Sequence, residues 1–288
     1  MSRIFIPRRD SIGSMPTSRA RPHEPRLNVR LRLAIVGVPM TDRSEPVSTA
    51  DAPCGDDPVF SRLHCWHDST ARSGAEHMAW DQVLYDQAVE PWLRIYRWPT
   101  PEVTFGYFMR WDDVGPCLGS RPATRRWTGG GLVEHGDDWT FSLVVPRAHE
   151  PAEWSPRASY QQIHHTLLAA LLAVATPNSA ALALVATSPD QGPGGLCFER
   201  PVTADLLVGD RKAAGGAQRR GRNGLLHQGS LQMQNLDSRW IKEFAHRLAT
   251  DVIEAPPPDQ DQPWADWQFM SRQLVADRYG SHQWNRAR

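Results

Sequence analysis

Hydrophobic and polar positions predict regular elements from about residue 60 onward and none before it. Alternating apolar positions rich in aromatic and branched side chains predict strands at residues 62–67, 93–98, 102–108, 140–145, 180–187, 203–208, 211–218 and 225–234. Apolar residues at helical spacing predict helices at residues 74–90, 159–175, 239–251 and 264–278. Strands that mostly come in runs, flanked by helices, favour an α+β fold with mixed or antiparallel sheet layers over a doubly wound one.

The amino-terminal residues have a different composition from the rest of the chain. Residues 1–40 contain eight arginines and only two acidic residues, and they are rich in proline and serine. We therefore expect residues 1–58 to form a disordered basic extension. An organelle transit peptide, or a true start at Met40, would explain the same pattern. Residues 59–288 are expected to form one catalytic domain that ends in two helices.

Charge and cysteine content narrow the function classes. The chain has 32 basic and 32 acidic residues, so neither a nucleic acid nor an anionic membrane is the expected partner. No apolar stretch approaches the ~18 residues that suggest a membrane span. The four cysteines show neither CxxC spacing nor a Cys/His ligand pattern, so no metal site and no disulfide framework is indicated. We expect a cytoplasmic monomer.

Lysine is rare, and one lysine lies in an unusual place. Only Lys212 and Lys242 occur beside thirty arginines. Lys212 belongs to a glycine-rich, strand-like run, and a compact ammonium fits narrow sites that a planar guanidinium does not. Chance in an arginine-biased composition is the alternative explanation on the lysine count alone.

Three stretches contain residues suited to chemistry. Residues 125–135 read Arg-Arg-Trp-Thr-Gly-Gly-Gly-Leu-Val-Glu-His, a run whose glycine N–H groups could bind a carbonyl or phosphate oxygen, or form a plain β-turn. Cys197 follows a Gly/Pro loop, at an element edge where reactive groups usually reside. A hairpin turning at Gly209 and Asp210 would bring Lys212 back toward Cys197. His227 could act as a base, although a lone strand histidine is more often structural.

In order, these motifs resemble the lipoate/biotin protein ligase catalytic family. The resemblance rests on Arg125-Arg-x-Thr-Gly-Gly-Gly-x-Val-x-His, Cys197-Phe, Gly209-Asp-Arg-Lys-x-x-Gly-x-Ala-Gln and Leu226-His-Gln-Gly-Ser. It covers roughly residues 62–235 and implies a fold like that of class II aminoacyl-tRNA synthetases. Cys197-Phe198 is closest to the cysteine-dependent octanoyltransferases. Gly215-Gly-Ala-Gln departs from the expected Gly-Ser-Ala-Gln, and Asp205 is reminiscent of the Asn-Asp pair of the ligases.

The resemblance implies Cys197 and Lys212 as catalytic residues. It implies that the following residues bind the acyl group or substrate: Arg125, Arg126, Thr128, Gly129, Gly130, Gly131, His135, Gly215, Gly216, Ala217, Gln218 and His227. The acyl chain is expected beside Trp127 and Leu132.

The implied reaction moves an octanoyl or lipoyl group from octanoyl-acyl carrier protein, through a Cys197 acyl-enzyme, to a lipoyl-domain lysine. The acceptor would be a glycine-cleavage H-type protein or a 2-oxo acid dehydrogenase subunit. This reaction requires no cofactor. The alternatives are a lipoate-protein ligase that uses ATP and Mg, and a non-catalytic homologue that binds acyl groups or lipoyl domains.

Overall fold

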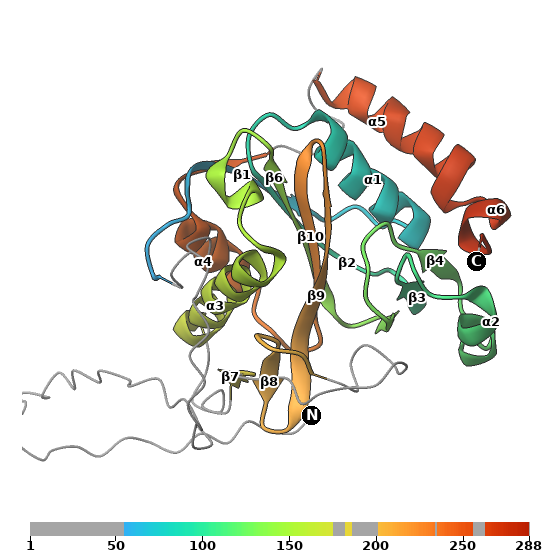
Figure 1. The fold of residues 1–288 in the computed structure, drawn as a ribbon, viewed down its shortest axis with the longest axis horizontal. Coiled ribbons are helices and arrows are strands. Elements are labelled where there is room, and N and C mark those ends of the chain that lie inside the picture. The colour runs from blue at the N-terminus through green and yellow to red at the C-terminus, as the bar shows by residue number, and fades with distance from the viewer. Residues whose placement is uncertain (1–54, 175–181, 186–200, 234, 256–262, 288) are drawn as a thin grey trace, which may run out of the picture. The chain divides into compact units, whose positions relative to one another are not determined.

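The computed structural model describes residues 55–174, 182–185, 201–233, 235–255 and 263–287. Its centre is an eight-stranded mixed sheet in the order β11-β1-β2-β6-β10-β9-β8-β7 (Figure 1). β1 is parallel to both β2 and β11, whereas the other neighbours in this sheet are antiparallel. The strands are β1 (Phe60–Asp68), β2 (Trp92–Arg97), β6 (Trp139–Pro146), β7 (Leu182–Leu184), β8 (Leu206–Val208), β9 (Arg211–Gly221), β10 (Gly224–Leu231) and β11 (Ala249–Glu254).

A small three-stranded sheet lies beside the large one, with β3 (Glu102–Phe105) between β4 (Ala123–Arg125) and β5 (Leu132–His135). β3 is parallel to β4 and antiparallel to β5. The short helix α2 (Trp111–Val114) and a 3-10 turn (Gly115–Cys117) connect β3 to β4. The glycine-rich stretch is the connection between β4 and β5.

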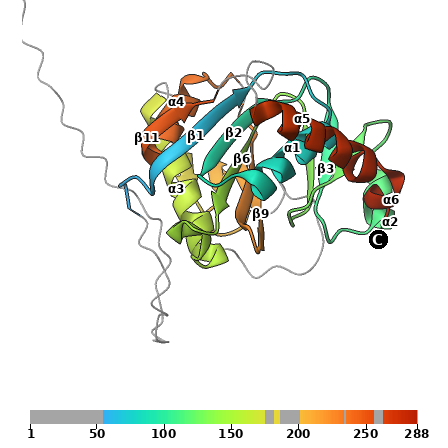
Figure 2. The ribbon, with the colours of Figure 1, turned by 90° about the horizontal axis from the view of Figure 1, so that it is seen from above.

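Helices cover both faces of the large sheet (Figures 1 and 2). On one face, α3 (Pro156–Val174) and α4 (Arg239–Leu248) pack on a core that includes Leu93, Phe141 and Leu225. On the other face, α1 (Gly74–Gln87) and α5 (Pro263–Leu274) enclose a second cluster with Trp80 and Trp264. Among the described residues, no helix is both long and apolar enough to cross a bilayer.

Local signals explain the start and end of α1. The Ser73 hydroxyl accepts from the Glu76 N–H, and the Glu76 carboxylate accepts from the Ser73 N–H, which is a complete capping box. The helix ends at Gln87, three residues before the predicted end, and Pro91 follows. β6 is buried at every position, as expected for a central strand between two helical layers.

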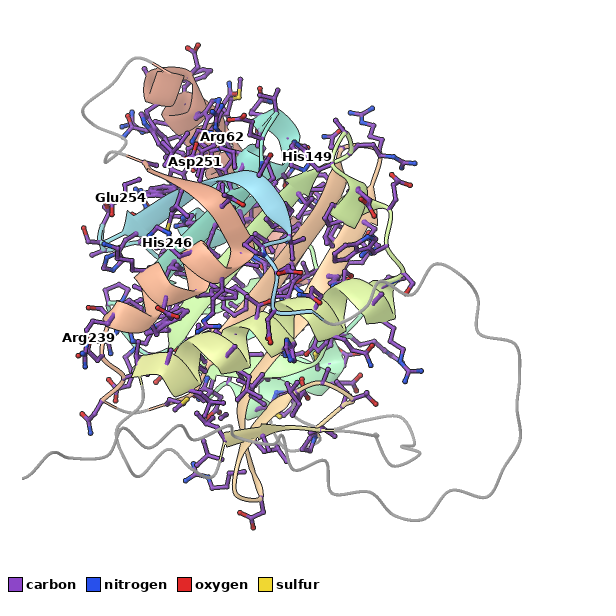
Figure 3. All side chains as sticks on the ribbon, turned by 90° about the vertical axis from the view of Figure 1, so that its left-hand side faces the viewer. Arg62, His149, Arg239, His246, Asp251 and Glu254 are labelled. Carbon is purple, nitrogen blue, oxygen red and sulfur yellow. The ribbon has the colours of Figure 1, made fainter. Side chains whose placement is uncertain are left out.

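The carboxyl-terminal part differs from the sequence prediction. The helix expected over 239–251 ends at Leu248, and Ala249–Glu254 instead forms β11, so that part of the prediction is wrong. Parallel pairing with β1 satisfies the backbone groups of these residues, and the Arg62–Asp251 ion pair lies across the two strands at 3.2 Å (Figure 3). After α5, the chain continues as a π-helix (Val275–Tyr279) and α6 (His282–Asn285).

Candidate functional site

Lys212 forms a buried ion pair with Asp205 and lies on the predicted hairpin. β8 and β9 pair through Leu207 and Lys212, and Gly209 in the turn between them has a φ of +63°, a conformation that favours glycine. The Lys212 Nζ lies 2.8 Å from Asp205 Oδ2, and the lysine side chain is only 3% exposed. The Tyr160 hydroxyl donates to the other Asp205 oxygen at 2.5 Å. The Asp205 carboxylate therefore fixes the position of the ammonium group.

Two glycines in β9 make this arrangement possible. A Cβ at Gly215 would lie 2.2 Å from Lys212 Cε and 2.5 Å from its Nζ. A Cβ at Gly216 would lie 2.5 Å from His227 Nε2. The Gly216 N–H donates to the Tyr160 hydroxyl at 2.8 Å, so the same tyrosine contacts the lysine's partner and the strand backbone. Glycine at 215 is a direct steric requirement of the lysine position.

A pocket lies against these glycines, between the two sheets. It contains about 420 Å³ of space not filled by protein atoms, part of it open to solvent. It is lined by Met78, Tyr96, Trp98, Thr104, Arg126, Val133, His135, Thr140, Gly215, Gly216, Ala217, Gln228, Gly229 and Ser230. Apolar walls with a few convergent polar groups are typical of small-molecule sites.

The glycine-rich loop is fixed at one side of this pocket. Arg126 donates through Nη2 to the carbonyls of Gly129, at 3.0 Å, and of Gly131, at 2.8 Å. Gly130 has a φ of +86°, and its carbonyl oxygen would lie 1.9 Å from a Cβ at Gly106. The Thr128 hydroxyl donates to Gln228 Oε1 at 2.7 Å and so ties the loop to β10.

His135 belongs to a hydrogen-bonded chain that ends on Arg126. Its Nδ1 lies 2.8 Å from Asp138 Oδ2, and its Nε2 lies 2.7 Å from the Thr104 hydroxyl. Arg126 Nη1 donates to that hydroxyl at 2.8 Å, which leaves the Thr104 proton for His135 Nε2. Burial lowers the pKa of His135 below its usual value, although the Asp138 carboxylate opposes this shift. The imidazole is therefore neutral and orients its neighbours rather than carrying charge.

His227 lies on the other face of β10, away from the pocket lining. It stacks with Phe141 and lies 5.3 Å, between ring centroids, from His164 on α3. Burial holds the pKa of His227 well below its usual value, and its Nε2 has no hydrogen-bond partner among the described residues. Gln218, opposite His227 in the β9–β10 ladder, bonds Ser159 on α3. Gln218 and His227 therefore face α3, on the side of the sheet that packs against this helix.

Arg125 and Arg126 have different surroundings, although they are adjacent. Arg126 lines the pocket, whereas the Arg125 side chain is 1% exposed and donates to the backbone carbonyls of Tyr107 and Met109. The guanidinium groups of Arg219 and Arg278 both contact the Trp127 ring, at 4.4 and 5.0 Å from its centroid. Leu132 packs in a separate cluster with Phe105. Neither Trp127 nor Leu132 is among the lining residues of the pocket.

The structure thus brings five of the predicted positions to one pocket, namely Arg126, His135, Gly215, Gly216 and Ala217. Lys212 lies against Gly215, and the Thr128 hydroxyl bonds Gln228 and so holds the loop against β10. Cys197 and Phe198 lie outside the described residues, so their positions remain sequence predictions.

The sequence analysis gave no role to two residues that hold parts of this site in place, although one of them belongs to a motif quoted above. Tyr160 on α3 contacts Asp205, and Gln228 on β10 bonds both Thr128 and Asp81. Asp81 is itself paired with the buried Arg94 at 2.7 Å, which makes Gln228 the link between the loop and a buried charge pair. The available signals were a tyrosine near the start of the helix predicted over 159–175 and a glutamine within the Leu226-His-Gln-Gly-Ser motif.

Comparisons with known proteins agree with this geometry. The mixed sheet is similar to that of protein Ta0514 from T. acidophilum, solved with bound lipoic acid, at a TM-score of 0.60 and 17% identity over 80% of this chain and 100% of that one. A lipoate-protein ligase A bound with ATP gives a TM-score of 0.57 and 18% identity over 79% of this chain and 98% of that one. At such identities the likeness defines the fold, which is that of lipoate ligase catalytic domains.

The family follows from the sequence match. The lipoyl protein ligase A/B catalytic domain matches residues 73–258, and the chain belongs to this family. Octanoyltransferase LipM of Oceanobacillus iheyensis is 31% identical over 177 residues, which are 58% of this chain and 62% of that protein. Octanoyltransferase LipM of Symbiobacterium thermophilum is 33% identical over 176 residues, covering 57% and 63%. The chain therefore spans somewhat less than two thirds of the length of these relatives.

Proposed function

We propose that this protein is an acyltransferase that moves an octanoyl or lipoyl group onto the acceptor lysine of a lipoyl domain, through an acyl-enzyme on Cys197. The observation that carries the proposal is the Lys212 ammonium, fixed 2.8 Å from Asp205 and packed against Gly215 at the pocket edge. Family membership and the similarity to two octanoyltransferases support it.

In the first step, the Cys197 thiolate attacks the thioester carbonyl of the acyl donor. The carbonyl oxygen takes up negative charge, and a fixed ammonium together with backbone N–H groups stabilises such charge most where water is excluded. Lys212 supplies that cation. Collapse of the intermediate breaks the donor C–S bond and leaves the acyl group as a thioester on the Cys197 sulfur. The donor leaves as a thiolate and takes up the proton that Cys197 lost on ionising.

In the second step, the neutral amine of the acceptor lysine attacks the Cys197 thioester. The C–S bond breaks, the amide forms, and the proton lost from the amine neutralises the departing thiolate. Thioester exchange is nearly isoenergetic and amide formation is downhill, so the sequence of steps requires neither ATP nor a metal ion.

The pocket suits an eight-carbon chain better than the positions of Trp127 and Leu132, neither of which lines it. Its apolar wall is formed by Met78, Trp98 and Val133, and the carbonyl end would face Gly215 and Gly216. We propose octanoyl-acyl carrier protein as the donor. The proposed acceptors are lipoyl-domain proteins, either a glycine-cleavage H-type protein or a 2-oxo acid dehydrogenase subunit.

The test is to incubate the protein with octanoyl-acyl carrier protein, without ATP, and to measure intact mass. We expect an octanoyl adduct that hydroxylamine removes, as it does a thioester. The Cys197→Ser variant, which lacks the thiol, should form no such thioester. Adding a lipoyl domain should discharge the adduct and raise the mass of the lipoyl domain by one octanoyl group. Absence of an adduct in the wild-type protein would contradict the transferase mechanism.

Two other outcomes identify the alternative functions. Lipoylation by a Cys197→Ala variant that depends on ATP, Mg and free lipoic acid would establish a ligase. Binding of octanoyl groups or lipoyl domains without turnover under either donor would establish a non-catalytic homologue.

A further inference from the structure

The last residues of the described chain complete the edge of the small sheet. β4 is an outer strand of that sheet, and its final residue, Arg125, is contacted from outside by Trp284 and Asn285. The Trp284 Nε1 donates to the Arg125 carbonyl at 2.9 Å, and the Arg125 N–H donates to Asn285 Oδ1 at 2.7 Å. Two side chains from α6 thus occupy the positions that a neighbouring strand would take.

The Arg125 side chain extends this contact in two directions. Its Nε donates to the Trp284 carbonyl and its Nη2 to the Asn285 carbonyl, each at 3.1 Å. Its Nη1 donates to the carbonyls of Tyr107, at 3.0 Å, and Met109, at 2.6 Å. A buried guanidinium with this many carbonyl partners joins α6 to the segment after β3, and little freedom remains for either.

The segment that contains Trp284 is anchored on α1. The guanidinium of Arg278 lies 3.8 Å from the Trp284 ring centroid and donates to Gln82 Oε1 at 2.9 Å. The Tyr279 hydroxyl donates to the same oxygen at 2.8 Å. The Asn285 amide donates back to the Tyr279 carbonyl at 2.8 Å, which closes the segment on itself. We call residues 278–285 the C-terminal segment.

Two residues next to Arg125, one in sequence and one among its hydrogen-bond partners, contact the glycine-rich loop. Arg126, the next residue, bonds the carbonyls of Gly129 and Gly131. The Tyr107 N–H donates to the Thr128 carbonyl at 2.9 Å. A displacement of Arg125 therefore shifts the loop from two sides. The C-terminal segment lies beyond residues 73–258, where the family match ends.

We propose that the C-terminal segment is a positioning element of the active site, in which Trp284 and Asn285 hold Arg125 and thereby set the glycine-rich loop for acyl transfer. The kinetic consequence of this proposal rests on the proposed acyl-transfer function, and its structural consequence rests on the hydrogen bonds between α6 and Arg125. Trp284 and Asn285 touch no reacting atom. They act through Arg125, so their loss should change the turnover of bound substrate more than its binding.

The test compares three full-length variants. Trp284→Phe keeps an aromatic ring beneath Arg278 and removes the N–H that bonds Arg125 together with part of the ring area. Asn285→Ala removes the acceptor of the Arg125 N–H. Arg286→Ala is the control, because its guanidinium lies over Trp111, 4.7 Å from the ring, in the same terminal turn. We measure kcat and KM for octanoyl transfer to a lipoyl domain, together with amide hydrogen exchange in residues 126–131 and in β10.

We expect Trp284→Phe and Asn285→Ala to lower kcat by about 10-fold or more, with KM changed less than about threefold, since ångström-scale misplacement costs up to about 100-fold. Exchange should quicken in residues 126–131 and stay unchanged in β10. The proposal would be overturned if Trp284→Phe and Asn285→Ala matched Arg286→Ala in both kinetics and loop exchange. It would also be overturned if exchange quickened as much in β10 as in residues 126–131. If the wild-type protein transfers no acyl group, the proposed function fails, and the exchange data alone decide whether the segment holds the loop.

Discussion

Replacing Gly215 by alanine tests the idea that this glycine exists to accommodate Lys212. The new methyl carbon would lie 2.2 Å from Lys212 Cε and 2.5 Å from Nζ, and 3.1 Å from Asp205 Oδ1. Ordinary carbon contacts are about 3.5–4.0 Å, so the lysine side chain must retreat by roughly 1 Å or more. The Lys212–Asp205 distance, 2.8 Å in the native protein, would lengthen beyond a hydrogen bond.

Two effects of known size follow from this displacement. An ångström-scale misplacement of a catalytic group costs up to about 100-fold in rate, so we expect kcat for octanoyl transfer to fall by about that factor. A weakened charge-assisted hydrogen bond costs about 1.5–3 kcal/mol, which the reduced backbone freedom of alanine offsets by about 0.5–1 kcal/mol. The unfolding free energy should therefore fall by about 1–2 kcal/mol.

The assay is octanoyl transfer from carrier protein to a lipoyl domain, followed by intact mass, with urea denaturation for stability. Gly136→Ala is the matched control, because a Cβ there meets nothing within 4 Å. In a Lys212→Ala background, which removes the colliding atoms, Gly215→Ala should lower the unfolding free energy little further, and this double-mutant cycle in urea denaturation isolates the steric pair. Activity of Gly215→Ala within about threefold of wild type would refute the reasoning.

Three further perturbations have definite expected outcomes. Lys212→Arg keeps the charge but puts a larger planar group into a nearly filled space, so we expect transfer to be abolished; near-normal activity would show that any cation suffices. Thr128→Val leaves the buried Gln228 oxygen without its donor, which should lower the unfolding free energy by about 1–3 kcal/mol in urea denaturation, and a change below about 0.5 kcal/mol would contradict this. Burial lowers the pKa of His164 from 6.5 to about 4, so its contribution to stability is complete above pH 6.5 and is lost as pH falls toward 4, by about 3 kcal/mol. His164→Asn can still donate to the Ala204 carbonyl and should flatten this pH dependence in denaturation curves measured between pH 4 and 7; an unchanged slope would assign it to other groups.

Elements with strong local signals were predicted well from the sequence. The α1 helix begins at its capping box, and the β8–β9 hairpin turns at Gly209, where a positive φ is required. The motif order also predicted the family, which the match to residues 73–258 confirms. Local chemistry was sufficient in these cases because caps and tight turns depend on a few neighbouring residues.

Other features depended on partners distant in the chain. Residues 249–251 read as the end of a helix, yet they form β11 because β1, nearly 190 residues earlier, offers a parallel partner. A central strand can override helical periodicity by satisfying backbone groups that a helix end leaves unpaired. Arg125 was predicted to bind substrate, and that assignment remains a prediction, but the observed partners are backbone carbonyls from α6 and the segment after β3.

The sequence by itself determined the chemical groups available to this protein: a glycine triplet after two arginines, a rare lysine in a glycine-rich strand, and a cysteine between them in the motif order. Only the tertiary structure decided which of these groups meet. Asp205 and Tyr160 lie 45 residues apart, and Arg125 and Asn285 lie 160 apart. Hydrogen bonds and ion pairs act over about 3 Å, and sheet order and helix packing set such distances, which no local pattern encodes.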